Sequence, residues 1–170
     1  MSRAYDNRAS LQHKILNGVN ILADNVASTL GPRGRNVILQ EQGRSPFITK
    51  DGVTVAHFVS LEDPFENAGS QIIKQAAIET NNTAGDGTTT ATVLARSILN
   101  ESQKYIATGV SPIELKRGID ATVKEITKKL EEMATPITNA EDIAHVATIS
   151  ANNDTTIGNL VTLAIDRVGE

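Results

Sequence analysis

Two glycines, one aspartate and three threonines follow one another in the sequence Gly-Asp-Gly-Thr-Thr-Thr of residues 85–90. Glycines can take positive φ angles and let the backbone approach a ligand, and the threonines would supply free amides where a helix begins. A carboxylate beside phosphate needs a divalent cation between them, so we expect Asp86 to bind the Mg2+ of a nucleotide. The alternative is an ordinary turn in which Asp86 or a threonine caps the helix. The residues expected to cradle the phosphates are Gly87, Thr88, Thr89 and Thr90.

A second turn, Thr-Leu-Gly-Pro at residues 29–32, follows an expected helix. The last carbonyls of a helix have no intrahelical partners and suit a cation, so Thr29 and Leu30 could hold a monovalent ion or a water near the nucleotide. Plain helix termination at Gly31 and Pro32 is the alternative.

A third turn contains Lys50, Asp51 and Gly52. Asp51 could act as a general base or orient the attacking water, provided that it lies within hydrogen-bond reach of the γ-phosphate. Otherwise Asp-Gly is simply a turn. The sequence has neither the Walker A pattern nor Gly-x-Gly-x-x-Gly, so the nucleotide fold is predicted to be of another kind.

Helices must position these turns, because amphipathic patterns occupy most of the chain. Apolar residues recur at steps of three or four between residues 9 and 30, which predicts a helix. We expect its buried stripe to consist of Leu11, Ile15, Val19, Leu22, Val26 and Leu30.

A β-hairpin is expected next, with strands at residues 36–40 and 47–50 and a turn at residues 43–46. An isolated two-stranded hairpin is only marginally stable in water. We therefore expect the hairpin to act as a contact arm that pairs with another part of the fold or with another chain.

Two helices are expected to flank the glycine-rich turn, one over residues 64–81 and one from Thr88 to a stop at Gly109. The residues expected on one face of the first helix are Phe65, Gly69, Ile72, Ala76 and Thr80. The second helix is expected to run through Val93, Leu94, Ile98 and Tyr105.

Three further helices are predicted from capping signals. Ser111 and Glu114 form a capping box for a long helix that Pro136 bounds, and Thr138 with Glu141 repeats this pattern for a short one. Asp154 should cap a last helix that reaches Val168. The stripe expected on the long helix is Leu115, Ile119, Val123, Ile126, Leu130 and Met133.

Composition narrows the classes of function. The 170 residues carry a net charge of -4 without a long basic tract, which argues against nucleic acid as the main partner. No apolar run reaches membrane-spanning length, so no membrane partner is expected. Cysteine is absent, which excludes disulfides and thiolate zinc sites. A cytoplasmic location is the resulting expectation.

The three turns also carry a resemblance. Residues 29–36 (TLGPRGRN), 49–53 (TKDGV) and 84–92 (AGDGTTTAT) resemble the group I chaperonins, the GroEL type, in order and spacing. Residues 61–63, 115–120 and 148–152 are similar to connecting motifs of the same family. The resemblance covers essentially the whole chain.

The resemblance implies a mainly α fold, the helical bundle of the chaperonin equatorial domain with one β-hairpin arm, that binds ATP, Mg2+ and K+. By position, Asp51 would be one of two catalytic carboxylates, and Ile149 and Ser150 would lie near the base and ribose. The hairpin would join a neighbouring subunit's sheet. The residues expected at phosphates, K+ or Mg2+ are Thr29, Leu30, Gly31, Pro32, Lys50, Gly52, Asp86, Gly87, Thr88, Thr89 and Thr90.

Judged by this family, residues 1–135 would form the N-terminal part of the equatorial domain, and residues 136–170 would begin the hinge-like intermediate domain. The chain would thus be an incomplete subunit, with catalysis only after completion. Its partners would be other subunits of a ring oligomer, and non-native proteins and a co-chaperonin lid would bind through further parts. The alternatives are a non-catalytic interaction module that joins chaperonin rings through the hairpin, and a small phosphotransferase that uses the glycine-rich turn alone.

Overall fold

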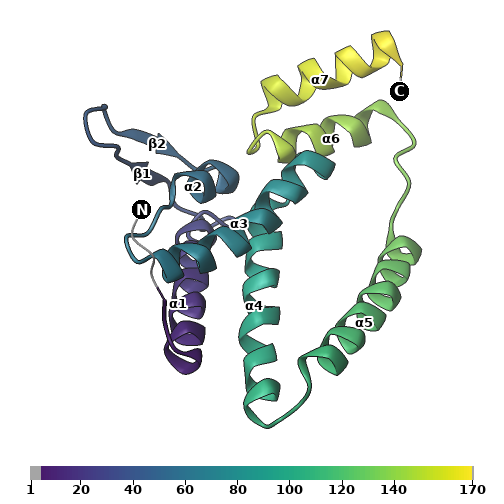
Figure 1. Cartoon of the computed structure of the whole chain (residues 1–170). Coiled ribbons are helices and arrows are strands. Elements are labelled where there is room, and N and C mark those ends of the chain that lie inside the picture. Colours follow the sequence, from purple (N-terminus) through teal and green to yellow (C-terminus); the bar gives the residue numbers. More distant parts are fainter. Residues whose placement is uncertain (1–4, 170) are drawn as a thin grey trace. The chain divides into compact units, whose positions relative to one another are not determined.

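The computed structural model describes residues 5–169, which are mainly α-helical with one two-stranded antiparallel sheet (Figure 1). The predicted fold class is confirmed. The chain divides into two compact units, Met1–Leu115 and Lys116–Glu170. Within the described residues, no helix combines the length and the apolar character that crossing a membrane requires. The elements are α1 (Arg8–Ala27), β1 (Val37–Leu39), β2 (Phe47–Thr49), α2 (Gly52–Phe58), α3 (Pro64–Ala84), α4 (Thr88–Ala107), α5 (Pro112–Met133), α6 (Ala140–Ser150) and α7 (Thr155–Val168).

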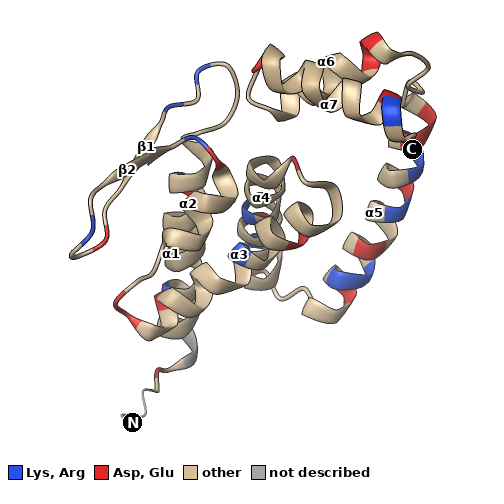
Figure 2. Cartoon of the chain, turned by 90° about the horizontal axis from the view of Figure 1, so that it is seen from above, with Lys and Arg blue, Asp and Glu red and all other residues tan. Residues whose placement is uncertain are grey.

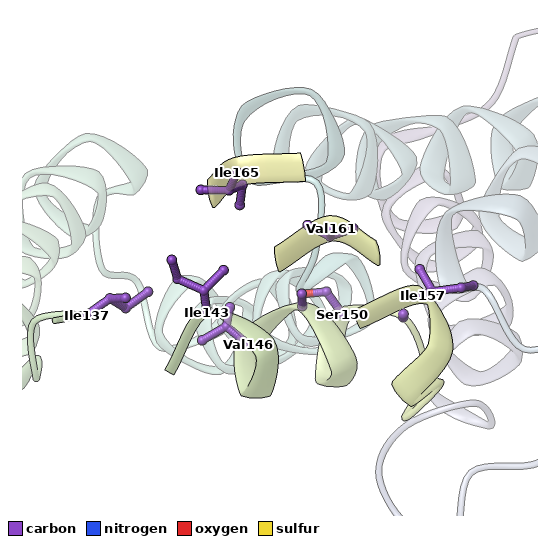
Figure 3. Close-up of a pocket in the computed structure, with 9 residues that line it drawn as sticks. Ile137, Ile143, Val146, Ser150, Ile157, Val161 and Ile165 are labelled. Carbon is purple, nitrogen blue, oxygen red and sulfur yellow. The ribbon is translucent and has the colours of Figure 1, made fainter. Parts of the chain in front are cut away.

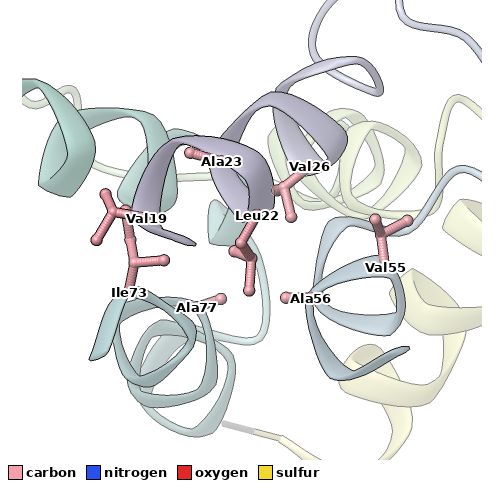
Figure 4. Packing of buried hydrophobic residues seen from close by; sticks show 8 residues of the cluster. All are labelled: Val19, Leu22, Ala23, Val26, Val55, Ala56, Ile73 and Ala77. Carbon is pink, nitrogen blue, oxygen red and sulfur yellow. The ribbon is translucent and has the colours of Figure 1, made fainter. Parts of the chain in front are cut away.

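The core of the first unit lies where α1, α2 and α3 meet. Figure 4 shows Val19 of α1 beside Ile73 of α3, and Leu22 pointing between the small residues Ala56 and Ala77. Burying an aliphatic side chain of this kind contributes about 1.5–3 kcal/mol, so a few such residues stabilise a core without aromatic rings. The centre of the predicted α1 stripe is therefore confirmed. The fully buried cluster is Val19, Leu22, Ala23, Val26, Val55, Ala56, Ile73 and Ala77.

Two glycines let α1 and α3 cross closely. A Cβ atom on Gly18 would lie 1.8 Å from the carbonyl oxygen of Glu66, and one on Gly69 would lie 2.0 Å from that of Ile15. Real Cβ atoms do not approach backbone atoms so closely, so each helix brings a glycine to the other's backbone. This crossing holds α3 against α1.

The structure corrects the predicted face of α3 and shows which side of α4 is buried. On α3, Ile72 is half exposed and the buried residues are Gly69, Ser70, Ile73, Lys74 and Ala77, because Gly69 turns the small residues toward α1. On α4, Leu94, Ile98 and Tyr105 are exposed. Both helices carry apolar side chains on more than one face, and the packing partners decide which face is buried. The residues of α4 that are buried or pack against the core are Thr88, Thr92, Ala95 and Leu99.

Several element ends also differ from expectation. Helix α1 ends at Ala27 rather than at Leu30, because the amides of Thr29 and Leu30 turn back to the carbonyls of Val26 and Ala27. Leu30 is consequently exposed instead of completing the stripe. The strands and the helices beside the glycine-rich turn shift by a few residues, and residues 52–58 form the helix α2, for which no element was predicted.

The predicted hairpin is confirmed. β1 and β2 pair antiparallel, with Val37 opposite Thr49 and Leu39 opposite Phe47. Leu39 is buried, whereas Ile38 and Ile48 are about two-thirds exposed (67% and 65%). Among the described residues the sheet has only these two strands, so its outer edges have no strand partner.

The second unit contains the helix pair α6 and α7. A Cβ atom on Gly158 of α7 would lie 2.1 Å from Oγ1 of Thr148 of α6, so the two helices approach closely there. Asp154 caps α7 as predicted, with its side chain accepting the amides of Thr156 and Ile157. The predicted cap of α6 is wrong by one residue, because Asn139 rather than Thr138 accepts an amide, that of Asp142.

An apolar groove of about 560 Å³ runs between α6 and α7. Figure 3 shows Ile143 and Val146 of α6 on one side and Val161 and Ile165 of α7 on the other. Helix α5 has acidic and basic residues along its length (Figure 2), and the predicted stripe residues Val123, Ile126, Leu130 and Met133 are exposed. Both features are apolar surfaces that the described residues of the second unit do not themselves cover.

Candidate functional site

The glycine-rich turn joins α3 to α4 with two residues in the left-handed region. Gly85 ends α3 with a φ of 74°, and Gly87 begins α4 with a φ of 83°, as the sequence predicts for these glycines. No side chain caps α4. The first amides of α4, from Thr88 onward, therefore remain directed out of the helix end. By contrast, side chains cap α1, α2, α3, α6 and α7, namely Asn7, Asp51, Asp63, Asn139 and Asp154.

The alternative interpretation is an ordinary turn in which Asp86 or a threonine caps α4. Asp86 does not cap α4, because its Oδ1 atom accepts the amide of the neighbouring Gly87 at 2.6 Å. The threonine hydroxyls do not cap it either. An uncapped helix N-terminus carries partial positive charge, which favours a bound anion.

The turn before α2 meets the start of α4. A Cβ atom on Gly52 would lie 2.2 Å from Oγ1 of Thr89 and 3.3 Å from Oγ1 of Thr88. A larger residue at this position would have to displace the Thr89 hydroxyl, so the starts of α2 and α4 lie in close contact. This contact brings two of the three predicted turns together.

The turn after α1 reaches the same place. Thr29 is buried, and its Oγ1 donates to the carbonyl of Val26 at 2.8 Å and lies 3.5 Å from Oγ1 of Thr89. Leu30, Gly31 and Pro32 follow on the surface, where Gly31 has a φ of 72°. The three predicted turns therefore converge through Thr29, Gly52 and Thr89.

Asp51 is the N-cap residue of helix α2 and does not merely form a turn. Its carboxylate accepts the amide of Thr54 at 2.8 Å and also the hydroxyl of that residue, while it remains exposed. These two bonds fix its orientation beside the convergence of the turns. Lys50, just before it, is half-buried.

The remaining predicted site residues, Ile149 and Ser150, end α6 in the second unit. Ile149 is exposed, and Ser150 lines the apolar groove of that unit. Their expected place near a base and ribose stays a prediction.

Sequence reasoning missed two residues that organise this site. Thr54 holds Asp51, and the Asp-x-x-Thr spacing at a helix start could have indicated it. Lys74 holds the far end of α2, where its Nζ donates to the carbonyls of His57 and Val59. The sequence signal for Lys74 is a positively charged residue among the small and apolar residues on the buried side of α3.

The donor set fits a Mg2+ ion that is held together with phosphate. Within residues 5–169, no group of three or more Asp, Glu, His or Cys side chains is placed to hold a metal. Mg2+ in nucleotide sites is commonly bound by one or two carboxylates with phosphate oxygens and water. Asp86, beside the α4 N-terminus, is the carboxylate that matches this arrangement.

A sequence model of the TCP-1/cpn60 chaperonin family matches residues 22–170. The chain belongs to this chaperonin family. The chaperonin chain has a fold similar to that of a group III chaperonin in the open state, with a TM-score of 0.78 and 23% identity over 96% of this chain and 33% of the other.

A second similar structure is the chaperonin gp146 from the bacteriophage EL 2 (Pseudomonas aeruginosa), crystallised in the presence of ATP-BeFx. The TM-score is 0.71, with 30% identity over 89% of this chain and 27% of that one. This chaperonin chain thus spans about a third or less of the length of both solved chaperonins.

Proposed function

We propose that this chain is the ATP-binding part of a group I chaperonin subunit, a ring-forming molecular chaperone that assists protein folding through ATP binding and hydrolysis. The observation that carries the proposal is the uncapped start of α4 at the point where Gly52 and Thr29 meet Thr89. A helix N-terminus left without a side-chain cap, beside two further turns, suits a phosphate chain.

In this proposal the phosphates lie on the amides of Gly87, Thr88, Thr89 and Thr90, and Lys50 adds a positive charge. Asp86 holds Mg2+, which neutralises phosphate charge. K+ would bind at the turn of residues 29–32, where backbone carbonyls follow the end of α1. The geometry supports this arrangement because the turn at Thr29 reaches Thr89.

Asp51 would orient the water that attacks the γ-phosphate. Its carboxylate is already held by Thr54 at the N-terminus of α2, next to the contact between Gly52 and Thr89. Phosphoryl transfer depends mainly on positioning and on charge neutralisation, so a fixed carboxylate can contribute by orienting the water, without covalent chemistry. We expect a second carboxylate from the rest of the subunit to be needed for turnover.

The broader features of the proposal concern the complete subunit. Residues 1–135 would belong to its equatorial domain and residues 136–170 to its intermediate domain, with Ile149 and Ser150 near the base and ribose. The subunits would form a cytoplasmic ring that encloses non-native protein under a co-chaperonin lid. Since this chain spans about a third or less of the solved chaperonins, these partners are proposals for the whole protein.

Calorimetry with ATP in the presence and absence of Mg2+ tests the proposal. Wild-type chain should bind ATP with Mg2+ dependence, and Asp86→Ala should abolish that dependence, because the metal loses its protein ligand. Glu101→Ala, a change of an exposed acid on the same helix α4, should bind as the wild type does. Equal metal dependence in the Asp86 and Glu101 variants would contradict the assignment.

One observation favours a second function, a module that joins chaperonin rings through the hairpin. β1 and β2 have no further strand partner among the described residues, and Ile38 and Ile48 are exposed. An extended edge of this kind can add to another sheet. Replacing Ile38 and Ile48 by glutamate should then abolish association with chaperonin subunits, measured by sedimentation, and leave ATP binding unchanged. Association that depends on ATP would instead favour the first function.

A further inference from the structure

Lys74 lies on the buried side of α3, beside Ile73 and Ala77, with only 8% of its surface exposed. A charge at a core position loses hydration, and an apolar residue of similar size is often more stabilising there. Burial lowers the pKa of this lysine below its ordinary value of 10.5. Lys74 therefore departs from the apolar pattern of the surface to which it belongs.

The ammonium group of Lys74 binds the C-terminal end of α2. Its Nζ donates to the carbonyl oxygen of His57 at 3.2 Å and to that of Val59 at 3.1 Å. The last carbonyls of a helix have no intrahelical partners, and a cation there also interacts favourably with the helix dipole. Lys74 thus ties α3 to the end of a neighbouring helix.

The opposite end of α2 carries the residues of the nucleotide site. Helix α2 has seven residues and is therefore about 10 Å long, so a movement of one end is transmitted to the other. At its start, Asp51 caps the helix and Gly52 packs against Thr89 of α4. Between the two ends, Val55 and Ala56 are buried in the core.

We propose that Lys74 is a positioning residue for the nucleotide site: by holding the C-terminal end of α2, it fixes where the turn of Lys50, Asp51 and Gly52 meets the start of α4. The inference rests on the proposed function, because it assigns a task to the same site. A lysine that only filled space would affect the stability of the fold, whereas a positioning lysine affects the order of α2 and the binding of nucleotide.

Lys74→Met separates these two roles, because methionine keeps an unbranched apolar stem and removes the charge and the donors. We expect the free energy of unfolding to change little, because the gain from removing a buried charge is offset by the loss of its bonds to the carbonyls of His57 and Val59. Amide hydrogen exchange of Val55 and Val59, measured by NMR, should accelerate about tenfold or more, because both bonds from the charged donor to the end of α2 are lost. The affinity for Mg-ATP should fall about tenfold.

Lys104→Met is the matched control, because Lys104 is an exposed lysine on α4 that pairs only with the nearby Glu101 in the described structure. Lys104→Met should change neither the amide exchange of Val55 and Val59 nor the affinity for Mg-ATP. Should Lys74→Met fail to fold, Lys74→Gln serves as the second variant, since its shorter side chain is uncharged and cannot reach both carbonyls. We expect Lys74→Gln to show the same faster exchange of Val55 and Val59 and the same lower affinity for Mg-ATP.

The outcomes distinguish this inference from the proposed function. Wild-type affinity for Mg-ATP together with wild-type exchange in α2 of the Lys74 variant would overturn the inference alone. Faster exchange in α2 with unchanged affinity would also overturn it, because Lys74 would then stabilise α2 without positioning the site. Absence of Mg-ATP binding in the wild-type chain would overturn the proposed function and, with it, the task assigned to Lys74.

Discussion

The α-carbon of Gly52 packs against the hydroxyl of Thr89 so closely that a Cβ atom at residue 52 would lie 2.2 Å from Oγ1. This relationship joins the start of α2 to the start of α4. It also predicts how the site responds when a single methyl group is inserted there.

Gly52→Ala should weaken Mg-ATP binding by about tenfold, because the new methyl group must displace the hydroxyl of Thr89 at the start of α4. Calorimetry measures the affinity. Gly118→Ala in α5 is the control, since a Cβ atom there meets nothing within 4 Å. That variant should bind normally, and equal affinities in both variants would show that the contact does not shape the site.

Asp51→Asn should separate hydrolysis from binding. Asparagine still caps α2, so the stability of the helix should be retained, whereas Asp51→Ala should cost about 1 kcal/mol. In an assembled chaperonin that contains this chain, Asp51→Asn should keep ATP binding and lose most single-turnover hydrolysis, because the carboxylate that orients water is gone. Near-normal turnover in this variant would remove Asp51 from catalysis.

Gly69→Ala should destabilise the first unit by about 1–3 kcal/mol or more, because the added Cβ would overlap the backbone of α1 at Ile15. Urea denaturation followed by circular dichroism measures this loss. Gly118→Ala, on an open helix surface, should instead be neutral or stabilising by up to about 1 kcal/mol. Similar stabilities for the two variants would mean that α1 and α3 do not cross closely in solution.

The stability should depend on pH through Lys14, which lies 3.0 Å from Asp6 and 2.9 Å from Asp63. Hydrogen bonds from Lys14 lower the pKa of both carboxyls below 3.8, so their contribution is present above pH 3.8 and is lost as the pH falls through the folded-state values. The bond to Asp63, followed by that to Asp6, raises the pKa of Lys14 above 10.5, so its contribution is lost only at higher pH.

Lys14→Met should therefore reduce the loss of stability below pH 3.8. Thermal unfolding of both proteins as a function of pH measures the difference, with Lys129→Met as a control for an exposed lysine. Parallel acid-side curves for wild type and Lys14→Met would contradict the prediction.

The exposed apolar stripe of α5 predicts self-association of the 170-residue chain in isolation, because uncovered apolar surface favours contact with other molecules. Replacing Ile126 and Leu130 by lysine should reduce association in sedimentation and the binding of a hydrophobic dye. The helical content should be unchanged, since both side chains are exposed. A monomeric wild-type chain with a sharp unfolding transition would instead indicate a self-sufficient domain.

Local chemistry made much of this fold predictable from the sequence. Gly85 and Gly87 adopt the expected left-handed conformation, Asp154 caps α7, and the strands around residues 43–46 form the expected hairpin. Each of these features depends on residues that are close in the chain. The sequence patterns therefore indicated most of the elements and the conformation of the glycine-rich turn without knowledge of the packing.

The packing itself required the tertiary structure. Helix α3 offers apolar residues on two faces, and the close contact of Gly69 with α1 decides that Ile73 is buried and Ile72 is not. The same dependence on distant partners brings Gly52 to Thr89 and Lys74 to the end of α2. Such contacts join residues far apart in the chain, so their geometry follows from how the helices pack and not from local sequence patterns.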